Sequence, residues 1–245
     1  MNHKINRLHM LLLLLVSMFL FQSCTSPQTK KGFNYPDVKI VSAMKNVMWK
    51  GELEGKIKLD SISNKNNLYG LGPLEGLQGE ILINDGVSYI SKVKTNKSMQ
   101  VETSFNVSAP FFVSAEVKQW QEIKLPDSIR NIEHLEIFID KKTKDRKRPF
   151  AFKLKGRVKS AKIHVQNLPE GTMVSSPKEA HQGQVNYYLK DNNVEIIGFF
   201  STEHQGVFTH HDSYLHMHLI TQDETMMGHL DDVDFGKMTI YFPLY

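Results

Sequence analysis

Apolar and polar residues alternate along much of this chain, which is the pattern of β-strands that bury one face. The clearest strand signals lie in GEILINDGVSYISKV (Gly79–Val93), where two apolar-rich runs flank an Asp-Gly pair. An Asp-Gly pair between alternating runs is the strongest short-range signal for a β-hairpin. Further β-segments are expected within residues 99–120, 150–166, 192–201, 213–221 and 237–244.

Two other stretches have the apolar spacing of three and four residues that is typical of an amphipathic helix. VKIVSAMKNVMWKG (Val38–Gly51) predicts a helix that ends at Gly51, because glycine readily takes the left-handed conformation after a helix. DSIRNIEHLEIFIDKK (Asp127–Lys142) predicts a second helix that begins at Asp127, where a short polar side chain can cap the first turn.

Each predicted helix precedes a group of predicted strands, so the order of elements repeats once along the chain. About 209 residues follow Pro36, enough for one large core or two small ones. We therefore expect an α+β fold of two similar half-domains, at about residues 37–125 and 126–245, each a helix packed with a mixed or antiparallel β-sheet.

Residues 1–23 have the composition of a secretory signal peptide. Lys4 and Arg7 precede an apolar run of about a dozen residues, which is shorter than the roughly 20 that a membrane-spanning helix needs. The sequence FQSC then resembles a lipobox, in which Cys24 is lipidated and becomes the first residue of the mature chain. The alternative is an ordinary signal peptide beside an unrelated cysteine.

The lipobox interpretation predicts an exported bacterial lipoprotein that its N-terminal lipid anchors to a membrane. Thr25 after Cys24 favours the outer membrane, and the polar residues up to Pro36 are typical of a flexible tether. Because Cys24 is the only cysteine, the chain can form no internal disulfide, cysteine-rich zinc site or iron–sulfur cluster.

The charge balance argues against nucleic acid as a partner. Removal of residues 1–23 takes away two basic residues and no acidic ones, which lowers the formal net charge from +4 to +2. This balance differs from the strong positive charge of most nucleic-acid-binding domains. The one basic cluster, KKTKDRKR (Lys141–Arg148), is interpreted as a solvated turn.

The segment SYLHMHLIT (Ser213–Thr221) places His216 and His218 two residues apart in a predicted strand. Alternate side chains of a strand point to the same face, so the two imidazoles are expected to lie side by side. His229 follows eleven residues later and can supply a third ligand. Three protein ligands with one open position are the arrangement of a catalytic zinc site.

Spacing alone leaves open the alternative of ordinary surface or structural histidines, because His204, His210 and His211 lie in the same region. His134 and His164 are interpreted as structural or exposed residues instead of ligands. The sequence contains no Gly-rich phosphate loop, no Gly-x-Ser-x-Gly elbow and no H-E-x-x-H motif.

Three segments resemble the α-acetolactate decarboxylase family in their order and spacing. They are LYGLGPLEGLQGEILINDGVSY (Leu68–Tyr89), FAFKLKGRVKSAKIHV (Phe150–Val165) and GFFSTEHQGVFTHHDSYLHMHLITQDETMMGHLDDVDF (Gly198–Phe235). The family has a glycine-rich run before a D-G turn, and later an H-L-H-F strand followed by G-G-H-V. The resemblance extends over about residues 38–235, and its most specific part is the H-x-H pair with the third histidine.

This resemblance implies a zinc ion held by His216, His218 and His229, between the half-domains and near the C-terminal half. It implies that Glu80 faces the substrate and that Lys153 stands where the family has an arginine for the substrate carboxylate. The implied reaction converts 2-acetolactate, a 2-hydroxy-3-oxo acid, to acetoin and carbon dioxide. Zinc would stabilise the enediolate that decarboxylation leaves, and Glu80 would handle the proton. The family also suggests a homodimer.

Three departures from the family pattern bear on turnover. Lys153 keeps the positive charge but loses the two-pronged fit of arginine to a carboxylate, and Arg157 is a candidate substitute. A second functional glutamate of the family, in a C-terminal extension, has no counterpart before the final YFPLY. Met227 stands where the family has a small residue.

These departures, together with the predicted export, support an alternative function: a non-catalytic or re-purposed zinc-binding surface lipoprotein of the same fold. A third alternative is a metal-dependent hydrolase that uses the same three histidines. Trp49 and Trp120 are expected to pack where helices meet sheets.

Overall fold

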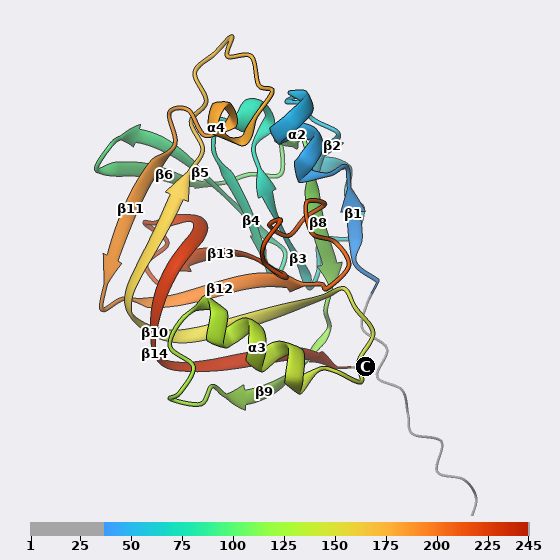
Figure 1. Cartoon of the computed structure of the whole chain (residues 1–245), viewed down its shortest axis with the longest axis vertical. Coiled ribbons are helices and arrows are strands. Elements are labelled where there is room, and N and C mark those ends of the chain that lie inside the picture. The colour runs from blue at the N-terminus through green and yellow to red at the C-terminus, as the bar shows by residue number, and fades with distance from the viewer. Residues whose placement is uncertain (1–36, 245) are drawn as a thin grey trace, which may run out of the picture. The chain divides into compact units, whose positions relative to one another are not determined.

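The computed structural model describes residues 37–244 (Figure 1). The predicted signal peptide, Cys24 and the tether lie outside these residues. The described part is mostly β-structure, and its three α-helices are short: α2 (Met44–Lys50), α3 (Ile132–Lys142) and α4 (Pro177–Ala180). None of the helices in this part is long and apolar enough to cross a membrane. The expected α+β class therefore agrees with the structure only broadly.

The first sheet has six antiparallel strands in the order β1-β8-β3-β4-β5-β6. Its strands are β1 (Lys39–Val41), β3 (Leu68–Pro73), β4 (Glu80–Asn84), β5 (Val87–Thr95), β6 (Ser98–Thr103) and β8 (Phe112–Glu116). A short pair, β2 (Ile57–Lys58) and β7 (Ser108–Ala109), and the 3-10 turns η1 (Leu59–Ser61) and η2 (Glu75–Leu77) complete this half.

The second sheet also has six antiparallel strands, in the order β11-β10-β12-β13-β14-β9. Its strands are β9 (Gln119–Lys124), β10 (Phe150–Val165), β11 (Val185–Lys190), β12 (Asn193–Phe200), β13 (Leu215–Thr221) and β14 (Met227–Leu244). β10 pairs with β12 through residues 150–157 and with β14 through residues 153–164. Strands β10, β12, β13 and β14 therefore form a closed ring, and three register shifts between β10 and β14 accommodate its curvature.

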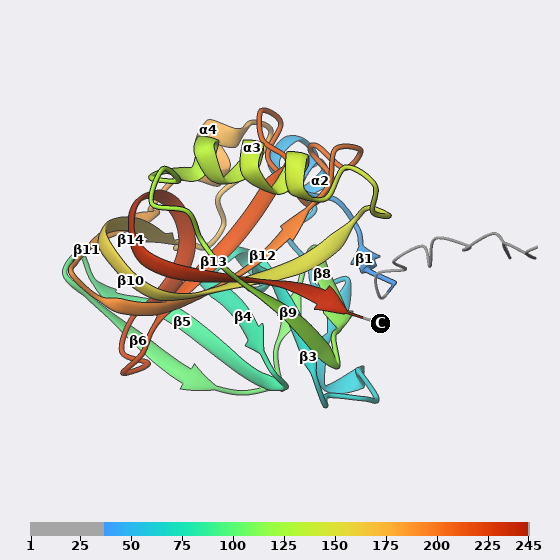
Figure 2. The same cartoon turned by 90° about the horizontal axis from the view of Figure 1, so that it is seen from below.

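Alternation along the strands separates two cores. Phe152, Leu154, Met217 and Leu219 belong to a buried cluster formed by the ring strands together with helix α3. The opposite face of β12 and β13 contributes Ile197, Phe199 and Ile220 to a second cluster, which also contains residues of the first sheet. In the view of Figure 2 the three helices lie on one side and strands β3–β6 on the other. The histidine-bearing face of β13 therefore looks toward the first sheet.

The predicted hairpin at residues 79–93 is confirmed. β4 and β5 pair from Glu80 with Ser91 to Asn84 with Val87, around a turn at Asp85 and Gly86. Both turn residues have positive φ, 48° and 80°, as a type I′ turn requires. The sequence signal was reliable here because it depends on two adjacent residues.

Both predicted helices begin later than expected. Residues 39–41 form β1, and Ser42 then takes a positive φ of 58° before α2. The C-terminal residue was predicted correctly, since Gly51 caps α2 in the left-handed conformation. Helix α3 is capped by Asn131, whose side chain accepts a hydrogen bond from the backbone N–H of His134, so the prediction of Asp127 was wrong.

The change from the first sheet to the second falls between β8 and β9, at residues 117–118. The expected boundary at 125/126 lies beyond β9, which pairs with β14 in the second sheet. The two tryptophans also differ: Trp120 contacts Tyr69 at a ring centroid distance of 5.0 Å, whereas Trp49 is 61% exposed. The prediction that Trp49 packs where a helix meets a sheet was wrong, because most of its side chain is exposed.

Candidate metal centre and active site

His216, His218 and His229 come together in the β13–β14 hairpin. His216 and His218 point to one face of β13, and His229 of β14 lies directly opposite His218 in the strand register. The three ring centroids are 5.0 to 5.3 Å apart. One ligand atom from each residue can be chosen so that all three lie within 4.8 Å of one another. The structure thus groups the three predicted ligands.

These imidazoles are suited to hold a metal ion. All three residues are buried. Burial, followed by repulsion from neighbouring histidines, lowers the pKa of His216 and His229 well below the ordinary value and that of His218 to about 3. They are therefore neutral at neutral pH, the form that binds metals. No hydrogen bond of ordinary geometry reaches His216 Nδ1 or either ring nitrogen of His218, and coordination through one nitrogen of each imidazole would offset part of that cost.

Glu80 faces this cluster from the first sheet. It is the first residue of β4, and Glu80 Oε2 lies 3.7 Å from His218 Nε2. The preceding Gly79 has a φ of 146°, and a Cβ there would meet the carbonyl oxygen of Ser91 at 2.2 Å, so only glycine permits this approach. Burial raises the pKa of Glu80 well above its ordinary value, which favours the protonated carboxyl in the metal-free protein.

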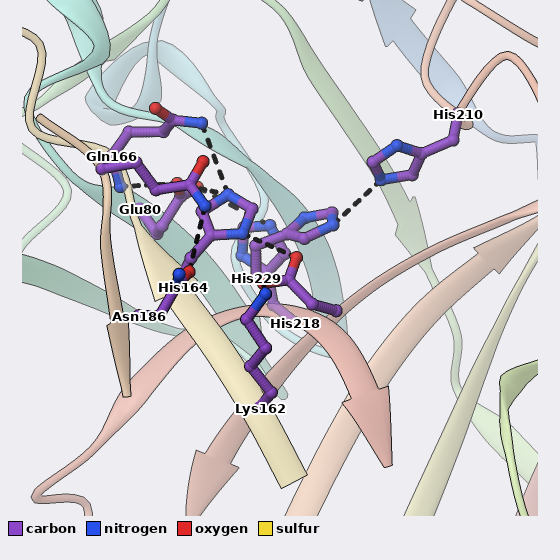
Figure 3. A network of polar contacts seen from close by, with 10 residues as sticks. Glu80, Lys162, His164, Gln166, Asn186, His210, His218 and His229 are labelled. Atoms are coloured by element: carbon purple, nitrogen blue, oxygen red, sulfur yellow. Dashed lines mark hydrogen bonds and ion pairs between the residues drawn. The ribbon is translucent and has the colours of Figure 1, made fainter. Parts of the chain in front are cut away.

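His164 joins the site from β10, although the sequence analysis assigned it a structural or exposed role. It lies opposite His229 in the register, with ring centroids 4.6 Å apart (Figure 3). His164 Nδ1 is 2.7 Å from Asp231 Oδ1, and its Nε2 is 3.3 Å from Gln166 Nε2 and 3.9 Å from Glu80 Oε1. The backbone N–H of Gln166 donates to Glu80 Oε1 at 3.2 Å.

Asp231 fixes one side of this network. Burial alone would raise its pKa, but the hydrogen bond with His164 and the charge of Lys162 together lower it. The carboxylate therefore stays ionised at neutral pH and orients the Nδ1–H of His164. His164, His229 and Asp231 also form a second group of metal-ligand type, so His229 lies at the junction of both groups.

His210 is a second histidine that the sequence analysis did not assign to the site. It comes from the loop of residues 201–214 between β12 and β13, and its Nε2 lies 2.9 Å from His229 Nε2 (Figure 3). Burial lowers the pKa of His210, so this imidazole is also neutral at neutral pH. A signal was present in the histidine-rich HQGVFTHHDSYLHMH, but spacing could not show which of these histidines turns inward.

A cavity of about 370 Å³ opens onto the site. Glu80, His164, Gln166, His216 and His229 form its polar side. Apolar side chains, mainly from helix α2 and the first half of the chain, form the other walls: Met44, Met48, Trp49, Pro73, Leu77 and Phe111. A volume of this size lies in the range of small-molecule sites.

Lys153 does not line this cavity. Its ammonium group lies 5.7, 5.2 and 5.0 Å from the ring centroids of Tyr69, Trp120 and Tyr241. Burial lowers its pKa. In the strand register Ile197 stands between Lys153 and His218, so the structure does not bring the predicted cation to the histidines.

The other sequence departures have plain structural positions. Arg157 is about half exposed and lies 3.6 Å from Asp191, outside the cavity lining, so it does not substitute for the family arginine at this site. Met227 is fully buried in the core between the sheets. Its larger side chain is accommodated by packing and does not enter the cavity.

Together, the fold and the site define a class of protein: two packed six-stranded sheets with a buried three-histidine centre opposite a carboxyl group. The sequence model for alpha-acetolactate decarboxylase matches residues 40–244. The chain therefore belongs to the alpha-acetolactate decarboxylase family, a family of carboxy-lyases.

Individual relatives agree with this assignment at low identity. The alpha-acetolactate decarboxylase of Brevibacillus brevis is 24% identical over 196 residues, and the match spans 80% of this chain but 66% of the relative, just under two thirds. The Lactococcus lactis subsp. cremoris protein of the same name is 26% identical, over 78% of each chain. The crystal structure of the Bacillus subtilis decarboxylase covers 85% of both chains with a TM-score of 0.69 and 20% identity, which shows the shared fold.

Proposed function

We propose that this protein is a zinc-dependent decarboxylase that converts 2-acetolactate to acetoin and carbon dioxide. The observation that carries the proposal is the buried group of three neutral imidazoles with Glu80 directly opposite. His216, His218 and His229 would hold the ion. When bound, zinc would supply a Lewis acid for the negative charge that develops on the ketone and hydroxyl oxygens of the substrate.

The remaining groups of the cavity would bind the substrate and hold the proton. Loss of carbon dioxide leaves the electron pair of the broken carbon–carbon bond on the substrate, and the carbon that carried the carboxylate must then gain a proton. Glu80 is suited to carry that proton on Oε2, because Oε1 accepts a hydrogen bond from the backbone of Gln166 and Oε2 is the oxygen that faces His218. The substrate carbon would receive it from there.

His164 would orient the substrate. Asp231 accepts from its Nδ1–H, which leaves Nε2 as an acceptor on the cavity side. In the structure the side-chain amide of Gln166, 3.3 Å away, donates to Nε2, and we propose that the tertiary hydroxyl of the substrate replaces it as the donor. Among the described residues that line the cavity, Lys45 is the one lysine or arginine. It therefore replaces Lys153 as our candidate for the substrate carboxylate, and the apolar walls would exclude water from the reaction.

The test measures acetoin formed from racemic 2-acetolactate by zinc-loaded protein. We expect formation well above the buffer rate, and Glu80→Gln should reduce kcat by about 100-fold or more if Glu80 supplies the proton. The exposed Glu170 offers a matched control, Glu170→Gln. The double variant His216→Ala/His218→Ala should retain no zinc. Bound zinc without any acetoin would instead favour the re-purposed zinc-binding protein of the same fold.

We also propose that the protein is exported and lipidated on Cys24. The N-terminal sequence supports this, with its basic start, short apolar run and FQSC. Expressed with a radiolabelled fatty acid, the full chain should incorporate label, and Cys24→Ser should not. Equal labelling of both forms would refute lipidation at this residue.

A further inference from the structure

We propose that His210 is a fourth imidazole ligand of the metal centre, which the loop of residues 201–214 places over the open coordination position until substrate displaces it. This inference rests on the proposed metal site. It concerns a residue outside the three-histidine group, in the loop between β12 and β13.

His210 directly contacts one member of the three-histidine group. Its Nε2 lies 2.9 Å from His229 Nε2. Two nitrogens on one tetrahedral zinc, each about 2.0–2.1 Å from the ion, are about 3.3 Å apart. The His210–His229 spacing is thus near the value for two nitrogens on one ion. His210 is not part of the group of three that lies within 4.8 Å, so its ring must also approach His216 and His218 for four imidazoles to share the ion. The His210 ring also lies edge-on to His216, with centroids 6.1 Å apart.

Hydrogen bonds hold the loop that carries His210 to helix α2 and to helix α3. Its carbonyl groups at Val207 and Gly206 accept hydrogen bonds from the first backbone N–H groups of helix α2, at Met44 and Lys45, with lengths of 2.7 and 2.9 Å. These bonds satisfy donors that a helix start leaves without intrahelical partners. They also join the loop to the helix that forms the apolar wall of the cavity.

The other end of the loop is held by helix α3. Glu136 accepts hydrogen bonds from the Ser213 hydroxyl at 2.6 Å and from the Tyr214 backbone at 2.8 Å. Phe208 and Thr209, immediately before His210, are fully buried. The backbone on both sides of His210 is therefore fixed, and the inward position of its ring follows from the loop structure.

The next residue provides an internal comparison. The His211 side chain is 91% exposed, and its ring nitrogen lies 3.8 Å from the exposed Asp212. Two adjacent histidines of one loop thus have opposite environments. Only His210 contacts a member of the three-histidine group, so substitution of His211 is a matched control for effects of the loop alone.

The chemical consequence would be a metal centre that has no free position for a further ligand in the absence of substrate. His216, His218 and His229 would leave a bound zinc ion able to take one further ligand, and the neutral imidazole of His210 would supply it in the resting protein. A substrate with two neighbouring oxygen donors could displace one monodentate imidazole. His210 would therefore strengthen zinc binding in the resting protein and exclude monodentate anions.

The experiment compares wild type, His210→Ala and His211→Ala as full chains, loaded with Zn²⁺ or with Co²⁺ as a spectroscopic probe. X-ray absorption of the zinc form should show four imidazoles in wild type and His211→Ala and three in His210→Ala. Chelator competition should show zinc binding about 10-fold or more weaker in His210→Ala. Azide should change the Co²⁺ spectrum of His210→Ala at concentrations that leave the wild-type spectrum unchanged.

Three imidazoles in wild type, or equal zinc affinity and Co²⁺ spectra in wild type and His210→Ala, would overturn the inference while the three-histidine site stands. Failure of wild type to bind zinc would overturn both the inference and the proposed site. His210→Asn, which keeps a polar side chain in the loop, repeats the comparison if the alanine variant does not fold, with folding checked by circular dichroism.

Discussion

His164 on β10 and Asp231 on β14 are joined by a 2.7 Å contact between Nδ1 and Oδ1, next to the candidate metal ligand His229. A carboxylate that accepts from one ring nitrogen fixes which nitrogen of the imidazole faces the other way. Here the other nitrogen faces Gln166 and Glu80 in the cavity. Asp231 does not line the cavity, but it determines which nitrogen of His164 faces the cavity as an acceptor.

We predict that Asp231→Asn lowers kcat for decarboxylation about 10- to 100-fold, the usual cost of losing such an orienting partner. The amide cannot hold the Nδ1–H tautomer as the carboxylate does, so Nε2 would no longer be a constant acceptor. Steady-state kinetics and zinc analysis of the purified variant check this. Asp232→Asn, at the exposed neighbouring position, is the control. Wild-type kinetics for Asp231→Asn would remove His164 orientation from the mechanism.

We predict that the metal-free protein loses stability as the pH falls below about 6.5, the ordinary histidine value. The three ligand histidines take up protons in the unfolded chain from that pH downward, whereas in the folded protein their lowered pKa values, about 3 for His218, prevent it. Each such histidine lowers the free energy of unfolding by about 1.4 kcal/mol for each pH unit that the pH falls within this window.

Glu80 has the opposite sign, because its raised pKa favours the folded state at low pH and this contribution is lost as the pH rises from about 4.5. The measurement therefore uses chelator-treated Glu80→Gln protein, with urea unfolding at pH 7.5 and 5.5. Replacing the three histidines with asparagine in this background should reduce the dependence, and the part that remains is expected from His181 and His210, whose pKa values burial also lowers. An equal slope in both proteins would contradict the assigned cause.

We predict that Lys45→Met raises KM for 2-acetolactate and that Lys153→Met changes kcat/KM by less than about tenfold, far below the loss of a group that acts in the reaction. Lys45 lines the cavity, whereas Lys153 lies among three aromatic rings outside it. Initial rates over a range of substrate concentrations separate the two parameters. A large loss in Lys153→Met with unchanged Lys45→Met kinetics would return the carboxylate contact to Lys153.

The parts of the structure that could be predicted from the sequence are those set by neighbouring residues. His216 and His218 share a face because strands alternate, and the Asp85–Gly86 turn requires only two residues with positive φ. The grouping with His229 follows from the short β13–β14 connection. Each inference needed only local geometry.

The parts that were missed depend on pairings between distant segments. His164 reaches the site because β10 pairs with β14. His164 and His229 are 65 residues apart in the sequence, and no local pattern indicates that they lie opposite each other. β9 likewise joins the second sheet through a distant pairing, with the last residues of β14. His210 turns inward through hydrogen bonds to α2 and α3, which the pattern of its own loop does not encode.

The closed ring of β10, β12, β13 and β14 places the residues for metal binding and the residues for substrate selectivity in different parts of the fold. Strands β13 and β14, which bear His216, His218 and His229, have hydrogen-bonded neighbours on both sides. The strand pairing therefore fixes the spacing of the three imidazoles. The apolar wall of the cavity comes mainly from α2 and from Pro73, Leu77 and Phe111, which lie outside the ring. Substitutions in that wall can therefore be used to change substrate selectivity, while the ring strands continue to hold the metal ligands in place.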